Sequence, residues 1–129
     1  MVDAVIAAGA VGINIEDGPS PPELLVRKIE TARQVADRRN VNLFINARTD
    51  VYLRGLVPAE DRVAETLRRA ALYQAAGANG LFAAGVTSEY EIKALCQGTS
   101  LPLNVLGFPG LPSPEVLEAL GVRLSLIHI

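Results

Sequence analysis

The amino-acid sequence predicts an α/β fold in which parallel strands alternate with helices. Short and nearly continuous apolar segments, typical of strands covered on both faces, are separated by segments of helical period. One sequence pattern recurs: small residues at the end of a helix, a glycine, and then a strand. It occurs at 7–13, at 75–81 and, more loosely, at 118–124. The glycine of each occurrence fits the position just after a helix end, where a left-handed backbone favours a residue without Cβ. Such alternation indicates βα units and a parallel sheet.

Four strands are expected between these helices. They are GINIE (12–16), NLFIN (42–46), NGLFAAG (79–85) and LPLNVLG (101–107). Polar residues stand at or near the ends of several of them, and in parallel α/β folds the carboxyl ends of strands carry the chemistry. The phosphate-binding motifs GxGxxG and GxxxxGK[ST] do not occur, which favours a barrel over a nucleotide-binding open sheet. A complete (β/α)8 barrel needs about 250 residues, so the chain has strands for roughly half of one.

Serines mark the expected helix starts. Ser20 and Ser88 each precede a glutamate by three residues, the spacing of a capping box, and Ser113 precedes a proline at a first helical position. Each helix has an apolar stripe that should face the sheet. The stripes are Leu25, Ile29, Ala32 and Ala36; Ala64, Leu67, Ala71 and Ala75; and Ile92, Leu95 and Cys96.

Composition limits the class of protein. The 129 residues have the size of one domain, half of them are hydrophobic, and a fifth are charged, as in soluble globular proteins. A net charge of −2 gives no electrostatic case for nucleic acid or an anionic membrane, and no apolar stretch is long enough to span a bilayer. Cys96 is the single cysteine, so neither a disulfide framework nor a cysteine-based metal site is expected. A cytoplasmic protein without nucleic-acid or membrane partners is the default expectation.

Four segments carry a family resemblance. Taken in order, GINIEDG, INARTDVYLRG, AAGANGLFAAGV and PLNVLGFPG resemble the isocitrate lyase and phosphoenolpyruvate mutase superfamily, above all its carboxyvinyl-carboxyphosphonate phosphorylmutase-like branch. The resemblance covers nearly the whole chain. It implies a (β/α)8 TIM barrel that binds Mg²⁺ and a small α-keto acid or phosphonate, and that makes or breaks C–C or P–C bonds through an enolate-like state. It places GINIEDG on the fourth barrel strand, so residues 1–129 would be the C-terminal half of the barrel, from the third helix to the eighth strand.

The resemblance assigns catalytic roles to Glu16 and Arg48. Glu16 matches the family's strand-four glutamate, which holds Mg²⁺ usually through water, as suits a hard cation that keeps part of its hydration shell. Arg48 matches the arginine that clamps the substrate carboxylate, a bidentate task for which a guanidinium is better shaped than an ammonium. The alternatives are a solvated carboxylate at a strand end for Glu16 and a surface salt bridge for Arg48.

Three further residues are candidates for substrate binding, and a scaffold role is the alternative for each. Asp50 falls where many family members have glutamate, and Asn46 and Asn104 are polar groups near strand ends that could orient a substrate. Asp17 follows Glu16 directly and should therefore face the opposite side of the strand, so we expect it to be structural.

The sequence also departs from the family pattern. The Asp-x-Asp pair that forms the main metal shell is absent, as is the KKCGH-type loop with the catalytic cysteine, because only GPSPPE follows Asp17. This argues against the isocitrate and methylisocitrate lyases and towards a mutase, hydrolase or decarboxylase. The segment LSLIHI (124–129) resembles translation into foreign sequence after the end of the native one. We expect the chain to be a fragment of a gene product.

Two functions therefore compete. The first is a fragment of a Mg²⁺-dependent lyase or mutase of small carboxylates or phosphonates, inactive by itself. The second is a catalytically inactive half barrel that associates with a second copy through its open edges. A homo-oligomer is expected in both cases.

Overall fold

The computed structural model describes residues 1–127, so His128 and Ile129 lie outside it. The elements are α1 (Val2–Ala7), β1 (Gly12–Glu16), α2 (Pro22–Arg38), β2 (Phe44–Thr49), η1 (Ala59–Asp61), α3 (Arg62–Ala76), β3 (Gly80–Ala83), α4 (Glu89–Gly98), β4 (Leu103–Gly107), α5 (Pro114–Leu120) and β5 (Leu124–Ile127). Strand and helix thus alternate along the chain, as predicted.

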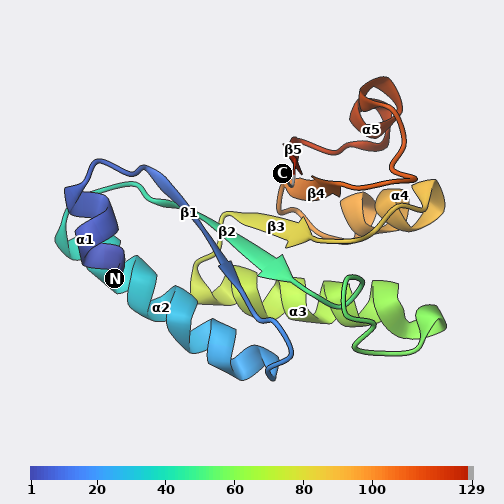
Figure 1. Ribbon diagram of the computed structural model, residues 1–129. Coiled ribbons are helices and arrows are strands. Elements are labelled where there is room, and N and C mark those ends of the chain that lie inside the picture. The colour runs from blue at the N-terminus through green and yellow to red at the C-terminus, as the bar shows by residue number, and fades with distance from the viewer. Residues whose placement is uncertain (128–129) are drawn as a thin grey trace.

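The five strands form one parallel sheet in the order β1-β2-β3-β4-β5. The order never reverses, unlike that of a doubly wound sheet, and each crossover carries its helix to the same face. Figure 1 shows the sheet curling, with α2 to α5 along its outer side and the inner face left open. The predicted C-terminal half of a (β/α)8 barrel is confirmed.

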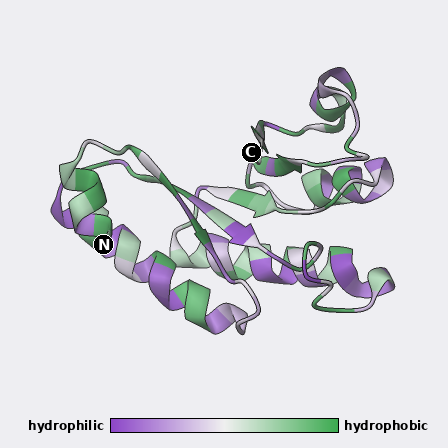
Figure 2. Ribbon diagram, in the orientation of Figure 1, coloured by the Kyte–Doolittle hydropathy of each residue, from purple (hydrophilic) through white to green (hydrophobic). Residues whose placement is uncertain are grey.

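The core fills the space between the sheet and the helices in two clusters. The predicted stripe of α2 is confirmed, since Leu25, Ile29, Ala32 and Ala36 are all buried against β1 and β2. Ile92 and Leu95 of α4 are also buried. Burying one such large aliphatic side chain is worth about 2 kcal/mol. Figure 2 shows hydrophilic and hydrophobic stretches alternating along the helices, as one-sided burial requires.

The predicted stripe of α3 is wrong. Ala64, Ala71 and Ala75 are exposed and Leu67 is half-buried. The buried face is instead formed by Thr66, Arg69, Ala70 and Tyr73. The helix is turned this way because the polar ends of Arg69 and Tyr73 bond to a buried carboxylate, Asp17, which a purely hydrophobic period does not register.

Two of the three expected serine caps form. The hydroxyls of Ser88 and Ser113 accept backbone N–H groups of the first turns of α4 and α5. Ser20 does not cap α2, whose N-cap is Pro21 without a side-chain bond. The N–H of Ser20 instead closes a turn on the carbonyl of Asp17, and Pro22 starts the helix with a preset φ.

Strand β2 begins and ends later than the predicted span 42–46 and therefore includes Arg48. The ladder continues because Arg48 has strand partners on both sides, Glu16 of β1 and Phe82 of β3.

The segment 124–129 is described only as far as residue 127, where it forms β5 beside β4. None of the helices in the described part of the chain is long and apolar enough to cross a membrane.

Candidate active site at the carboxyl ends of the strands

The inner face of the half barrel presents a row of side chains at the carboxyl ends of the strands. Parallel register pairs Glu16 with Arg48 and Arg48 with Phe82, so these three side chains lie next to one another on the same face. They border a cleft of about 320 Å³, a size at the lower end of small-molecule sites. The cleft is lined by Asn14, Ile15, Glu16, Arg48, Phe82, Leu106 and Leu126.

Arg48 is held in place by two carboxylates and a ring. Its Nε donates to Oδ1 of Asp50 at 2.7 Å, and its Nη1 lies 2.9 Å from Oε2 of Glu16. Its Cζ lies 5.8 Å from the centroid of the Phe82 ring, within cation–π range. About a quarter of the Arg48 side chain, 26%, stays exposed to the cleft side. The guanidinium is therefore oriented before any ligand arrives.

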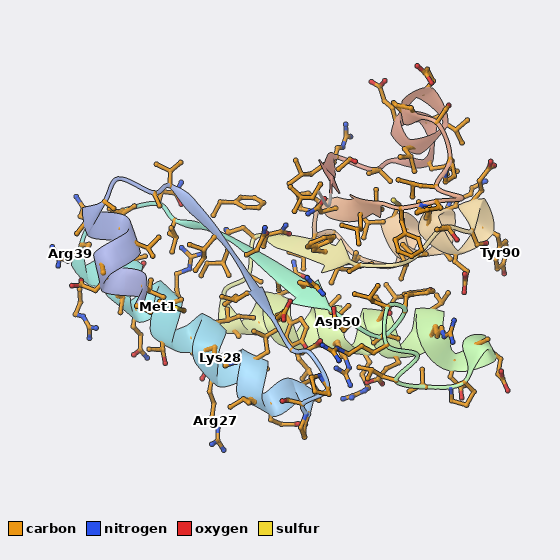
Figure 3. The ribbon with its side chains drawn as sticks, viewed as in Figure 1. Met1, Arg27, Lys28, Arg39, Asp50 and Tyr90 are labelled. Carbon is orange, nitrogen blue, oxygen red and sulfur yellow. The ribbon has the colours of Figure 1, made fainter. Side chains whose placement is uncertain are left out.

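Asp50 lies beneath the cleft and does not line it. Its carboxylate is fully buried, and its second oxygen accepts a hydrogen bond from Nε of Arg54 at 2.9 Å. Figure 3 labels Asp50 where the end of β2 meets the following loop. Both carboxylate oxygens thus bind arginines, which makes Asp50 a support of Arg48. The predicted contact between Asp50 and substrate stays a prediction.

Asp17 fixes the backbone under this site. One of its oxygens accepts the N–H of Asp50 at 3.0 Å, and the other accepts Nη1 of Arg69 at 2.8 Å and the hydroxyl of Tyr73 at 2.6 Å. Burial raises the pKa of the Tyr73 hydroxyl, and the negative charge of Asp17 raises it further. The phenol therefore stays protonated and donates its hydrogen bond. A second acid, Glu65, accepts Nε of Arg69 at 2.7 Å. The expected structural role of Asp17 agrees with this network.

The two asparagines have different surroundings. Nδ2 of Asn46 donates to Oδ1 of Asn14 at 2.8 Å, whereas its own Oδ1 is buried without a hydrogen-bond partner among the described residues. A Cβ on Gly80 would come within 2.9 Å of that oxygen, so only glycine leaves it room. Asn104 is buried on β4 with neither amide atom paired within residues 1–127. A buried polar atom without a partner lowers the stability of the fold. The inner face around Asn46 and Asn104 is therefore suited to bind further polar groups.

The candidate metal ligand is Glu16, and half of its side chain is exposed at the cleft. Across residues 1–127, no three His, Cys, Asp or Glu side chains converge as a metal site would need. Glu16 is instead the ion-pair partner of Arg48. The described residues therefore do not by themselves form a Mg²⁺ site, although Glu16 can supply one contact to an ion that keeps several of its waters.

The structure brings Glu16, Arg48 and Asp50 into direct contact and leaves Asn46 and Asn104 outside the lining of the cleft. Sequence reasoning missed Phe82 and Arg69. Phe82 lies in a nearly continuous apolar strand, and its inward direction follows only from the register that pairs it with Arg48 of β2. The sequence analysis did not single out Arg69, whose one local signal is that it stands four residues before Tyr73 on the same helix face.

The family model described as phosphoenolpyruvate phosphomutase matches residues 1–127. The chain is 34% identical over 126 residues to an uncharacterized protein of Mycobacterium tuberculosis (strain ATCC 25618 / H37Rv), covering 97% of this chain and 47% of that protein. It is 30% identical over 130 residues to an oxaloacetate decarboxylase of Bradyrhizobium diazoefficiens, covering 97% and 45%. The chain thus spans about half the length of the curated relatives it matches.

Solved structures show the same arrangement. A crystal structure of a protein provisionally named a phosphonomutase, from Burkholderia cenocepacia J2315, superposes with a TM-score of 0.89 at 39% sequence identity, covering 97% of this chain and 54% of that one. The crystal structure of 2,3-dimethylmalate lyase superposes with a TM-score of 0.80 at 22% identity, which supports the fold alone.

Proposed function

The chain belongs to the phosphoenolpyruvate phosphomutase family, and from this premise we propose that it carries the carboxylate-binding wall of a lyase or mutase of small acids. The reaction class is the making or breaking of a C–C or P–C bond next to a carboxylate, on an α-keto acid or phosphonate. The observation that carries the proposal is Arg48, oriented by Asp50 at the carboxyl end of a parallel strand and open to a cleft.

The contribution of this chain to such a reaction is binding and orientation. Arg48 pairs with the substrate carboxylate, and its fork fixes the plane of that group. Because Asp50 is held by Asp17 through its backbone, the guanidinium need not reorganise as negative charge develops on an enolate-like state. The predicted contacts of Asn46 and Asn104 with substrate remain part of the proposal, supported by their unpaired amide atoms within the described residues.

Magnesium enters the proposal only through Glu16. The superfamily resemblance implies Mg²⁺, and Glu16 would supply one contact to it through water. No group of three metal-ligating side chains forms among the described residues, so this chain's own contribution to the reaction is the binding and orientation that Arg48 provides. We propose that the chain by itself, without further side chains to bind Mg²⁺, does not turn over substrate. A cytoplasmic location likewise stays a prediction.

A second candidate function is supported by a separate observation. Phe44 lies on the inner face of β2 and is 40% exposed, and β1 and β5 each have a neighbour on one side only among the described strands. These features favour a half barrel that associates with a second copy through its edges. The two candidates differ in whether Arg48 binds a ligand.

The proposal is tested by titrating the chain with pyruvate and following backbone amide signals by NMR. Arg48→Lys keeps the charge and loses the fork, and we expect about tenfold weaker binding, as the loss of one charge-assisted hydrogen bond implies. Arg38→Lys, an exposed position at the end of α2, is the matched control and should bind like the original chain. Equal affinities of the Arg48→Lys variant and the original chain would show that Arg48 is scaffold.

A further inference from the structure

A row of three residues crosses the inner face, one step nearer the amino ends of the strands than Glu16 and Arg48. Parallel register pairs Asn14 of β1 with Asn46 of β2, and Asn46 with Gly80 of β3. Asn14 is exposed and lines the cleft, whereas Asn46 is only 3% exposed. The row therefore places a buried amide directly beside an amide that a ligand can reach.

The buried amide orients the exposed one. Nδ2 of Asn46 donates to Oδ1 of Asn14 at 2.8 Å, so the acceptor end of the Asn14 amide is occupied. Nδ2 of Asn14 has no hydrogen-bond partner within the described residues. Asn46 is itself confined, because it shares with the Phe44 ring the space that Gly80 leaves: a Cβ on Gly80 would lie 2.9 Å from Oδ1 of Asn46 and 2.9 Å from Cζ of Phe44. The donor end of Asn14 is thus left for a ligand.

Few side-chain donors are available to an acid in this cleft. Of the seven described residues that line it, only Arg48 and Asn14 carry a side-chain N–H group, since an ionised Glu16 only accepts hydrogen bonds. Arg48 already contacts Asp50 and Glu16, whose charges offset its own. A carboxylate brings two oxygens with about four lone-pair sites. An acid bound here therefore needs a donor besides Arg48.

Asn14 and Arg48 are placed to share one small ligand. Asn14 stands two residues before Glu16 on β1, and Glu16 pairs with Arg48, so the two donors are diagonal neighbours on the same face. Strands about 4.8 Å apart that rise about 3.3 Å per residue put such Cα atoms about 8 Å apart. Both side chains line the same cleft of about 320 Å³, so a three-carbon acid held by Arg48 lies within reach of Asn14.

We propose that Asn14 is the second hydrogen-bond donor for the acid that Arg48 binds, and that Asn46 is a positioning residue that presents the donor end of the Asn14 amide. The inference rests on the proposed role of Arg48 and adds a residue to the same site. Because Asn14 is neutral, it strengthens binding of an acid without drawing Glu16 away from Arg48, as a second cation would.

The inference is tested by titrating the chain and its variants with pyruvate in metal-free buffer, followed by NMR. Asn14→Leu keeps the size of the side chain and removes the amide, and we expect about tenfold weaker binding, the cost of one hydrogen bond to a charged group. Asn42→Leu is the matched control at an exposed position that does not line the cleft, and it should bind like the original chain.

A second measurement needs no variant protein to bind. The side-chain NH₂ signals of Asn14, identified by their absence from the spectrum of Asn14→Leu, should shift as pyruvate is added to the original chain. Their titration should give the same affinity as the backbone signals, because both report one binding event.

A double variant tests the role of Asn46. Asn46→Leu should weaken pyruvate binding by releasing Asn14, so the variant that combines Asn14→Leu with Asn46→Leu should bind no more weakly than Asn14→Leu alone. Losses that add would show that Asn46 contacts the acid itself and would overturn its positioning role.

The outcomes separate this inference from the proposed function. If Arg48→Lys weakens binding but Asn14→Leu does not, the inference is overturned and the proposed function stands. Unmoved NH₂ signals of Asn14 in a chain that binds pyruvate overturn the inference in the same way. No detectable binding of pyruvate to the original chain overturns both.

Discussion

Two adjacent acids at the end of β1 have opposite surroundings, and this difference organises the site. Glu16 faces the cleft with half of its side chain exposed, whereas Asp17 is buried and accepts hydrogen bonds from three donors. Successive side chains of a strand point to opposite faces, so one acid is placed for ligand chemistry and the other for support. Arg48 of β2 and Asp50, which lies just after the strand, depend on this support through the backbone N–H of Asp50.

Removing the charge of Asp17 should therefore destabilise the fold strongly. Asp17→Asn leaves Arg69 buried with one carboxylate partner fewer, and breaking a buried pair from one side costs about 3 kcal/mol. Urea unfolding followed by circular dichroism measures this loss. Asp37→Asn, on the exposed side of α2, is the matched control and should stay within about 0.5 kcal/mol of the original chain. A loss no larger than that of the control would mean that the network is dispensable.

Glu16 alone should not hold a metal ion. Because no group of three acids, histidines or cysteines forms among the described residues, we expect no saturable heat from Mg²⁺ in the micromolar range by calorimetry. Its pairing with Arg48 opposes metal binding further, since the ion would compete with the guanidinium. Micromolar affinity that disappears in Glu16→Ala would contradict this expectation and place a metal site within the chain.

At the scale of elements, α3 connects the site to the outer layer through charge. Glu65 bonds to Arg68 on the surface and to Arg69 at the buried face, and Arg69 reaches Asp17 beneath β1. The hydrogen bond from Arg68, followed by that from Arg69, lowers the pKa of Glu65 to about 2, although burial acts in the opposite direction. The helix is thus held by ion pairs as well as by packing.

The lowered pKa makes a prediction about acid. A carboxyl whose pKa is lower in the folded than in the unfolded chain adds stability above its unfolded value of 4.5, and that stability is lost as the pH falls toward about 2. Glu65→Gln should cost about 1 kcal/mol at neutral pH and should lose less on acidification than the original chain. Urea unfolding at neutral pH and at about pH 3 measures both quantities. Glu60→Gln, at the exposed 3₁₀ turn, is the control. Parallel pH profiles for Glu65→Gln and the original chain would rule out the coupling.

Local signals explain which elements the sequence could predict. The bounds of β1 and the buried stripe of α2 follow from apolar period alone, and both agree with the structure. The stripe of α3 could not be predicted in this way, because its buried face is made by Arg69 and Tyr73 and depends on a partner 52 and 56 residues away. Arg48 and Glu16 were found through motifs, whereas the inward turn of Phe82 requires the register between β2 and β3.

At the scale of the whole molecule, the open faces of the half barrel are the main physical difficulty. The inner face exposes Phe44 at 40%, and a groove of about 610 Å³ runs between α1, the edge of β1 and α2. Leu24 borders this groove and is 46% exposed. In a complete barrel, side chains from alternate strands fill the interior in layers, so Phe44 has no opposite wall in the described chain, and Leu24 of α2 is likewise uncovered on the helix side of the sheet. Each large apolar group left in water forgoes about 2 kcal/mol, against a typical domain margin of about 5–15 kcal/mol.

We therefore predict that the chain associates through its edges or packs loosely and aggregates. Sedimentation velocity over a range of concentrations should show a dimer or larger species, and near-UV circular dichroism should show weak aromatic signals if packing is loose. Phe44→Lys places a charge on the inner face and should shift the chain toward monomer. Tyr90→Lys, an exposed residue that Figure 3 labels on α4 far from β1, is the matched control and should not change the association. A concentration-independent monomer with sharp aromatic signals and a cooperative melt would instead mean that five strands close their own core.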